Sequence, residues 1–235
     1  MECDAVRVRY GGIEVLHGVR IAAAHGTFAA LIGPNGAGKT TLLDWCAGAA
    51  TEASATDGRL RLNGVEATGW SSARRARAGL RYVPFERNVF PGLSVLDNLR
   101  ATRDSTQGST QGNPASGSSS DSNSGPGPDP DPALELFPEL ARLADRPASV
   151  LSGGERQLLA LACALHGPGR ILLIDEPTHG LAPQLVDRVL AELARTAHED
   201  GRAVLVAEPS ADTLSTYTDF LWPLDRGRRT PATGA

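Results

Sequence analysis

The sequence predicts an α/β fold: a mostly parallel sheet flanked by helices, joined to a small antiparallel β subdomain and a helical subdomain. Ala29–Ile32 is a short apolar run of strand type that leads through a glycine-rich loop into a helical pattern. Ile171–Ile174 is apolar throughout, as in the central strand of a parallel sheet, and is followed by Asp-Glu. Val6–Tyr10 alternates apolar residues with arginine, which is the pattern of a half-buried antiparallel strand.

The loop after the first of these runs reads G-P-N-G-A-G-K-T-T, the spacing of a phosphate-binding loop. Its glycines let the backbone turn tightly and aim N–H groups inward, and the following helix N-terminus adds positive partial charge. Lys39 would reach the β- and γ-phosphates of a nucleotide, and the Thr40 hydroxyl would bind Mg²⁺. This arrangement is typical of a P-loop NTPase core. The predicted nucleotide-binding residues are Gly33, Pro34, Asn35, Gly36, Ala37, Gly38, Lys39, Thr40 and Thr41.

The alternative interpretation of this loop is an ordinary glycine-rich turn that enters a helix. Composition argues against it, because Lys39 is the only lysine among 23 basic residues and all the others are arginine. A compact ammonium on a flexible stem fits inside a loop that wraps phosphate, whereas a planar guanidinium does not. The lysine therefore favours a nucleotide site.

Length, charge and cysteine content limit the class of protein. The 235 residues suffice for one full core with a smaller lobe, and a net charge of −4 provides no overall field for nucleic acid, so we expect no nucleic-acid partner. Cys3, Cys46 and Cys163 are far apart in the sequence and lack metal-binding spacing, so we expect reduced, partly buried thiols and a cytosolic protein.

A membrane-spanning segment is not expected. Ile21–Gly38 lacks Asp, Glu, Lys and Arg, but glycine and proline interrupt it, and it is better explained as a strand with the phosphate loop. The first four residues, Met-Glu-Cys-Asp, lack the positive charge of a secretory signal.

Two hairpins are predicted for the antiparallel subdomain. Gly11-Gly12 turns the first strand back into Ile13–Leu16, and Arg59–Leu62 with Asn63-Gly64 forms the second hairpin. Tyr10 lies where its ring could stack on a purine; taken alone, such a residue is more often an ordinary strand aromatic, and only the motifs further along the chain reverse that preference.

The middle of the chain changes composition abruptly. Tyr82–Phe85 is predicted to be extended and Val95–Arg100 to begin a helix. Asp104–Pro132 is almost entirely small and polar, so we expect a disordered insertion, because such a segment cannot offset its ordering entropy. A helix is predicted to follow, because apolar residues recur at helical spacing at Leu134, Leu136, Phe137, Leu140 and Leu143.

A second chemical motif is L-S-G-G-E-R-Q at Leu151–Gln157. Ser152 and Glu155 form a predicted capping box that opens a leucine-rich helix. An ordinary cap would explain those two residues, but it does not explain Gly153 and Gly154 in the first turn, where each glycine costs about 1 kcal/mol relative to alanine. Two bare amides at a helix N-terminus are suited to bind phosphate.

The third motif is the end of the strand at Ile171–Glu176. Active groups of parallel sheets lie past the carboxyl ends of the strands, where Asp175 and Glu176 fall. Asp175 can hold Mg²⁺ through water, and Glu176 can orient or deprotonate an attacking water. A solvated acidic turn is the alternative, which the upstream phosphate loop disfavours.

Together these motifs resemble the ATP-binding cassette (ABC) family, with Gly33–Thr41 as Walker A, Leu151–Gln157 as signature and Ile171–Glu176 as Walker B. The resemblance extends from Ala5 to Arg228 except for the insertion. Within the family, four segments are similar to the ATPase subunits of branched-chain amino-acid type importers: V-F-P-G-L-S-V-L-D-N-L at 89–99, L-F-P-E-L at 136–140, R-P-A at 146–148 and G-L-A-P at 180–183.

The resemblance implies ATP and Mg²⁺ as cofactors, Lys39 and Glu176 as catalytic residues, and Thr40 and Asp175 as metal-holding residues. Tyr10 would stack on adenine. The signature residues Ser152, Gly153, Gly154 and Glu155 would contact ATP bound to the opposite subunit. The implied domains are an ATPase domain over 1–228, with a helical subdomain over about 86–166, and a short tail over 229–235.

Two positions depart from the family pattern. Phe85 stands where most relatives carry a glutamine that senses the metal, and Pro209 stands where most carry a histidine that contacts the γ-phosphate. The branched-chain subgroup itself varies at both positions.

The leading hypothesis is an importer subunit that hydrolyses MgATP to power transport through separate permease subunits, at the cytoplasmic face of the membrane. Its implied partners are a second cassette, with a heterodimer favoured over a homodimer, and indirectly an extracytoplasmic solute-binding protein. The alternatives are a hydrolysis-impaired regulatory cassette, favoured by Phe85 and Pro209, and a soluble non-transport ABC ATPase, which would have a coiled-coil insertion or tandem cassettes.

Overall fold

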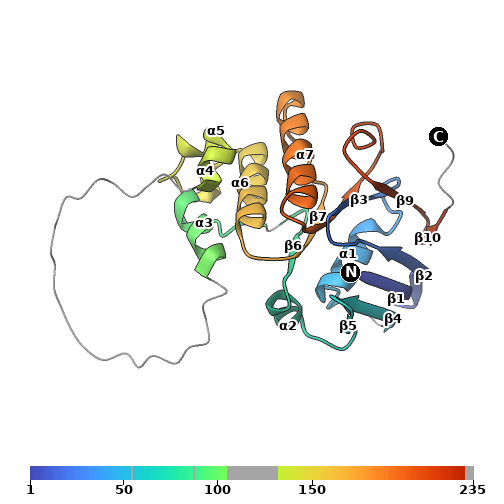
Figure 1. Ribbon diagram of the computed structural model, residues 1–235. Coiled ribbons are helices and arrows are strands. Elements are labelled where there is room, and N and C mark those ends of the chain that lie inside the picture. Colours follow the sequence, from blue (N-terminus) through green and yellow to red (C-terminus); the bar gives the residue numbers. More distant parts are fainter. Residues whose placement is uncertain (54, 87, 105–131, 231–235) are drawn as a thin grey trace, which may run out of the picture.

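Two sheets organise the protein, for which a computed structural model describes residues 1–53, 55–86, 88–104 and 132–230. The six-stranded sheet has the order β10-β9-β3-β8-β7-β6, and the four-stranded sheet the order β2-β1-β4-β5 (Figure 1). The predicted α/β class is confirmed. The six-stranded sheet consists of β3 (Thr27–Ile32), β6 (Leu80–Val83), β7 (Ile171–Asp175), β8 (Ala203–Glu208), β9 (Phe220–Asp225) and β10 (Arg228–Arg229).

The larger sheet is parallel except for β10, so the carboxyl ends of its central strands lie along one edge. Ile32, the last residue of β3, pairs with Glu208 at the end of β8. Asp175, the last residue of β7, pairs with Ala207. This register brings the phosphate loop and the Asp-Glu pair to the same edge.

Alternate residues of the buried strands face two separate cores. In β7, Leu172 and Ile174 pack into a core with the helical part of the molecule, while Ile171 and Leu173 pack into a core with the antiparallel sheet. A fully apolar strand is therefore required, because both of its faces exclude water. The helices of the first core include α6 (Gly153–His166) and α7 (Pro183–His198), and α1 (Lys39–Ala47) belongs to the second.

The antiparallel sheet contains both predicted hairpins. Its strands are β1 (Glu2–Tyr10), β2 (Ile13–Ala22), β4 (Ala55–Leu62) and β5 (Val65–Glu66), with β1 paired to β2 and β4 paired to β5. The extended segment predicted at Tyr82–Phe85 is shifted, because β6 ends at Val83, just before Pro84, which lacks the N–H for a ladder bond.

The helical part is made of short elements around α6, with α3–α5 at the end of the molecule farthest from the antiparallel sheet (Figure 1). These elements are α3 (Val95–Asp104), α4 (Pro132–Leu136), α5 (Pro138–Ala141) and a 3₁₀ turn (Ala148–Val150). The single helix predicted from Leu134 to Leu143 is wrong. Pro138 begins a new helix and Phe137 leaves helical geometry, because the residue before a proline is driven out of the α region.

The predicted insertion lies almost wholly outside the described residues. Its first and last residues, Asp104 and Pro132, are the exceptions, since they belong to α3 and α4. In the described part of the chain, no helix is long and apolar enough to cross a membrane.

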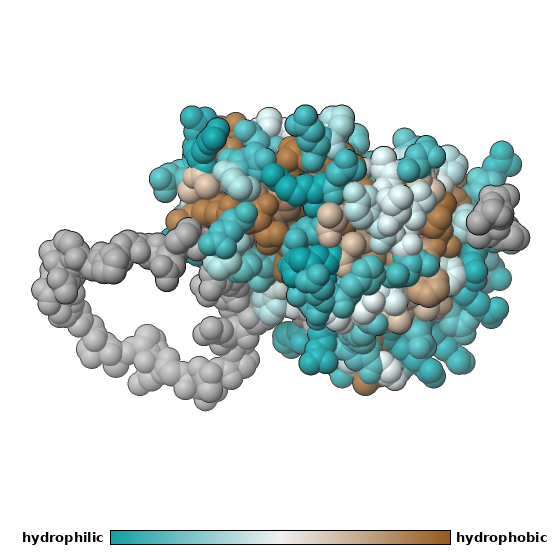
Figure 2. Space-filling view, turned by 45° about the horizontal axis from the view of Figure 1, so that its top comes forward, coloured by the Kyte–Doolittle hydropathy of each residue, from teal (hydrophilic) through white to brown (hydrophobic). Residues whose placement is uncertain are grey.

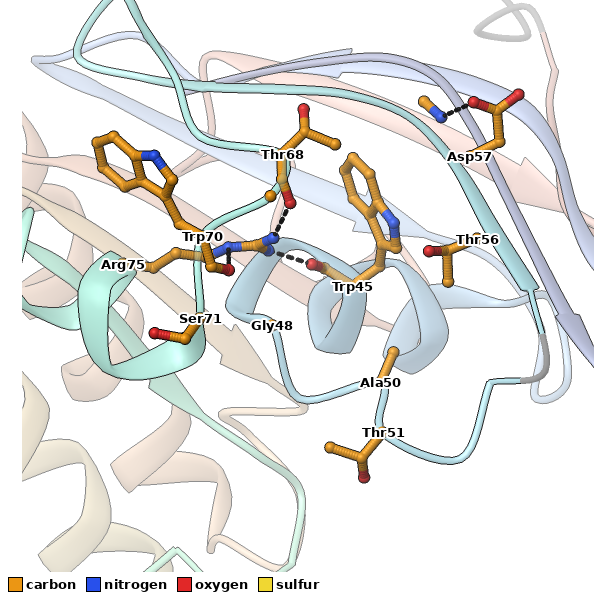
Figure 3. A pocket seen from close by; sticks show the side chains of 12 residues that line it. Trp45, Gly48, Ala50, Thr51, Thr56, Asp57, Thr68, Trp70, Ser71 and Arg75 are labelled. Atoms are coloured by element: carbon orange, nitrogen blue, oxygen red, sulfur yellow. Dashed lines mark hydrogen bonds between the residues drawn. The ribbon is translucent and has the colours of Figure 1, made fainter.

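Arg75 ties the C-terminal end of α1 to α2 (Ser72–Arg77) (Figure 3). Its buried guanidinium donates to the carbonyl oxygens of Trp45 (2.5 Å) and Cys46 (2.9 Å), the last turn of α1. It also donates to the carbonyls of Thr68 and Trp70. Because α1 has no basic residue in its last turn, this distant arginine supplies the positive charge that its C-terminus favours.

None of the three cysteines forms a disulfide, as predicted, and all three are buried, where partly buried thiols were expected. Two of them are nevertheless neighbours in space, since Cys3 Sγ and Cys46 Sγ lie 3.2 Å apart across β1 and α1. Their separation in sequence hides this contact.

Candidate functional site

The phosphate loop connects β3 to α1, and two of its glycines are required by geometry. A Cβ on Gly33 would lie 2.0 Å from the carbonyl oxygen of Leu224, so any larger residue would displace β9. Gly38 precedes α1 with φ of 100°, a left-handed conformation that strongly favours glycine. The loop backbone therefore approaches the sheet closely and then turns into the helix N-terminus.

Lys39 is held inside this loop by the loop's own backbone. Its Nζ donates to the carbonyl oxygens of Gly33 (2.7 Å) and Pro34 (3.3 Å). Within the described part of the chain Lys39 has no ion-pair partner, although it is almost fully buried. A buried ammonium that is bound only to carbonyls is available to an anion that enters the loop.

Thr40 and Asp175 meet as the two predicted metal-holding residues. The Thr40 hydroxyl donates to Asp175 Oδ2 at 2.6 Å, although 135 positions separate them. Asp175 Oδ1 is buried and has no hydrogen-bond partner among the residues that the structure describes. A hydroxyl oxygen beside an orphaned carboxylate oxygen is a donor set that suits Mg²⁺.

The electrostatics of Asp175 agree with a cation site. Burial raises the pKa of this carboxyl, and the negative charge of Glu176 raises the pKa further, against the opposing effects of Thr40 and Lys39. A divalent cation would reverse this balance and stabilise the ionised form.

Glu176 directly follows β7 with an unusual backbone. Its φ of 49° places a non-glycine residue in the left-handed region, which is sparsely populated and strained. Three hydrogen bonds hold the Glu176 backbone: its N–H donates to Ala207 O (2.9 Å), and its carbonyl accepts from His179 N (3.1 Å) and Gln157 Nε2 (3.2 Å). Strain at the predicted catalytic residue is thus maintained by its surroundings.

The signature residues open α6 as predicted. The capping box is present: Ser152 N–H donates to Glu155 Oε2 at 2.7 Å, and Glu155 N–H donates to Ser152 Oγ at 3.3 Å. The bonds from Ser152 lower the pKa of Glu155. A Cβ on Gly153 would meet nothing within 4 Å, whereas one on Gly154 would lie 2.9 Å from the carbonyl oxygen of Gly180. The first turn of α6 is therefore uncovered at Gly153 and tightly packed at Gly154.

Tyr10 ends β1 close to the phosphate-loop helix. Burial raises the pKa of its hydroxyl, and the charges of Asp44 and Glu52 raise it further, while Thr41 acts in the opposite direction. Tyr10 and Thr41, two of the predicted nucleotide-binding residues, thus lie beside one another.

The sequence reasoning missed Glu208 altogether and gave no separate role to Gln157, the last residue of the signature motif; both are buried. Glu208 Oε1 accepts bonds from Thr178 N (2.9 Å) and Thr178 Oγ1 (2.8 Å), next to the Asp-Glu edge. Gln157 accepts from Asn88 Nδ2 at 3.1 Å and bonds the Glu176 carbonyl. For Glu208 a signal existed, because it follows an apolar strand at the same sheet edge.

This geometry defines a class of protein that binds a nucleoside triphosphate at the edge of a parallel sheet. A model of the ABC transporter family matches residues 16–179, and the chain belongs to that family. It is one of the family's ATP-binding chains, with the P-loop ATPase fold.

Several transport ATP-binding proteins are similar in sequence to this chain along most of its length. It is 34% identical over 225 residues to the high-affinity branched-chain amino acid transport ATP-binding protein BraG of Pseudomonas aeruginosa, covering 96% of this chain and 88% of the relative. It is 31% identical to the probable branched-chain amino acid transport ATP-binding protein LivF of Archaeoglobus fulgidus, covering 93% and 85%. It is also 34% identical to the phosphonates import ATP-binding protein PhnC of Stutzerimonas stutzeri, covering 93% and 79%.

Solved structures share the fold. The dimeric ATP-binding cassette MJ0796, in a post-hydrolysis state bound to ADP and Pi, aligns with a TM-score of 0.78 at 20% identity, over 100% of this chain and 99% of that one.

Proposed function

We propose that this chain binds and hydrolyses MgATP to power import of a branched-chain amino acid or related small polar solute through separate membrane subunits. The transport ATP-binding proteins BraG and LivF support the substrate class. The phosphonate importer PhnC, at similar identity, makes a phosphonate the second candidate.

The observation that carries this function is the contact between Thr40 and Asp175 beside Lys39. Mg²⁺ held by Thr40 and Asp175 would neutralise charge on the β- and γ-phosphates. Lys39 would stabilise charge on the transferred phosphoryl group, and Tyr10 would stack on adenine. Glu176 would orient or deprotonate the attacking water, which requires its carboxylate to be fixed and ionised.

A second cassette would complete each site. Ser152 and Gly153 are exposed at the start of α6, so the Ser152 hydroxyl and the Gly153 amide would be available to ATP bound by another chain. We favour a heterodimer, because Phe85 and Pro209 remove two polar side chains that family members use near the γ-phosphate, which would make this chain's own site slow. Residues 1–228 would act as the ATPase domain.

Membrane subunits would dock on the helical part of the molecule, and the protein would then lie at the cytoplasmic face of the membrane. Hydrophobic surface gathers over this end of the molecule (Figure 2). Phe90 and Val150 are 58% and 63% exposed. Their segments lie together, because Ser149 N–H donates to Pro91 O at 3.0 Å. Exposed apolar side chains from adjoining segments suit a protein interface.

A hydrolysis-impaired regulatory cassette is the second candidate function. Phe85 and Pro209 favour it, since neither offers a side-chain hydrogen bond to metal or phosphate. A soluble, non-transport ABC ATPase is the third, and the transport relatives disfavour it.

The decisive test of hydrolysis is Glu176→Gln. The amide keeps the shape of the side chain but cannot accept a proton from water, so ATP affinity should persist while turnover falls by about 10²-fold or more. Phosphate release and nucleotide binding measure the two properties. Equal phosphate release by both proteins would contradict the catalytic role, and absence of release from wild type, alone and with its partner cassette, would support the regulatory alternative.

If Phe90 and Val150 form the surface on which the permease subunits dock, their substitution should affect assembly and not hydrolysis. Changing Phe90 and Val150 together to serine should leave ATP hydrolysis by the isolated chain unchanged but abolish its co-purification with the permease subunits. Ile13→Ser, which alters a side chain that is 72% exposed on the antiparallel sheet, is the matched control and should not affect assembly. Normal assembly of the Phe90/Val150 variant would place the interface elsewhere.

A further inference from the structure

Phe85, Glu176 and His179 are brought together where β6 and β7 end. The N–H of His179 closes a turn by donating to Glu176 O at 3.1 Å. Within this turn His179 Nδ1 lies 3.5 Å from Glu176 Oε2. The Phe85 ring meets the imidazole edge-on, with 4.9 Å between ring centroids and 79° between their planes.

The charges around Glu176 give this contact a physical role. Asp175 and Glu208 are neighbouring carboxyls, and the charge of Glu176 raises the pKa of each. Like charges on one side drive the Glu176 carboxylate away from the sheet edge. In the part of the chain that the structure describes, His179 is the one basic side chain within ion-pair distance of Glu176.

We propose that His179 is a positioning residue that fixes the Glu176 carboxylate, and that the Phe85 ring holds the His179 imidazole in place. The inference rests on the proposed hydrolytic function. It assigns a role to Phe85, which stands where a glutamine was expected: the ring acts on the water-activating carboxylate through His179. The residual ATP hydrolysis at this chain's own site then depends on both Phe85 and His179.

The contrasting explanation is a surface histidine that serves only the turn. The His179 side chain is 63% exposed, and the backbone bond to Glu176 would remain without an imidazole. If the turn alone mattered, the nature of the side chain would not affect turnover. The two explanations therefore differ in what side-chain substitutions do.

The first experiment compares His179→Ala with His179→Asn in steady-state ATP hydrolysis by the isolated chain. Alanine should lower kcat by about tenfold and leave KM for ATP unchanged, since positioning acts on the chemical step. Asparagine, which places an amide N–H near the position of Nδ1, should restore most of the loss. His25→Ala, at an exposed histidine bonded to Asn63, is the control and should match wild type.

The second experiment tests the role of Phe85 with a double-mutant cycle. Phe85→Ala should lower kcat in the same direction as His179→Ala, and Phe85→Tyr, which keeps the ring, should not. In a His179→Ala background, Phe85→Ala should have no further effect, because both changes act through one contact. If the double variant lost kcat by the product of the two single losses, the coupling between Phe85 and His179 would be overturned.

The outcomes separate this inference from the proposed function. If Glu176→Gln abolishes turnover while His179→Ala does not lower kcat, or His179→Asn is as slow as alanine, the positioning role is overturned and hydrolysis stands. If Glu176→Gln leaves phosphate release unchanged, the catalytic assignment itself fails, and the positioning role fails with it.

Discussion

Glu208 ends β8 as a buried carboxyl, and among the described residues its side chain bonds Thr178 alone. Burial raises the pKa of Glu208, and the hydrogen bonds from Thr178 oppose this shift. The ionised form is therefore disfavoured in the folded protein relative to the unfolded chain. Such a group makes the free energy of unfolding fall as pH rises above the ordinary glutamate pKa of about 4.3 and through the raised folded value.

Glu208→Gln should remove this dependence, because the amide oxygen can accept both Thr178 bonds without a charge. The stability of the variant relative to wild type should increase between pH 5 and pH 8, as measured by urea unfolding at each pH. Glu135→Gln, at an exposed position of α4, is the control and should show no such gain. A difference between variant and wild type that shrinks toward pH 8 would contradict the assignment.

At the scale of elements, α1 depends on a residue outside its own sequence. Arg75 donates to carbonyl groups at the C-terminal end of this helix (Figure 3). The phosphate loop precedes its other end. Burial lowers the pKa of Arg75, so the guanidinium is held at some cost, which its four carbonyl partners offset.

Arg75→Leu should leave these carbonyls without donors and destabilise the protein by about 2–4 kcal/mol. The urea midpoint measures the loss. Arg77→Leu changes an exposed arginine of the same helix and should shift stability by less than about 0.5 kcal/mol. Similar losses for both variants would show that the effect comes from α2 itself and not from the capping of α1.

At the scale of the whole molecule, we expect the signature of this chain to contact ATP that is bound by the phosphate loop of a second chain. Mixing this chain with a second cassette of its transporter, one that carries the glutamine and histidine absent here, should raise ATP hydrolysis well above the sum of the separate activities. Ser152→Arg should remove most of that gain, because the larger side chain covers the exposed first turn of α6.

Ser152→Arg also removes the N-cap of α6, because Ser152 Oγ accepts a bond from Glu155 N–H, so the loss of a cap needs its own control. Ser71→Arg removes the equivalent N-cap of α2 and should preserve the gain while costing about 1 kcal/mol of stability. Rapid hydrolysis by this chain alone would refute the need for a heterologous partner.

The fold class, the three motifs and the candidate catalytic residues could all be predicted from the sequence, because they depend on local rules. Glycines in a phosphate loop, a capping box and an apolar strand that ends in Asp-Glu are each complete within a few residues. Pro138 was also visible in the sequence, yet the helical spacing of the leucines concealed its effect.

The contacts between distant side chains could not be predicted from the sequence and are visible in the folded protein alone. The contacts of Thr40 with Asp175, of Cys3 with Cys46, of Arg75 with the end of α1 and of Phe85 with His179 join segments separated by dozens of residues. Periodicity indicates which face of an element is buried, but strand order, register and helix placement decide what that face touches. The sequence therefore did not reveal the surroundings of Glu176, although it made Glu176 a candidate catalytic residue.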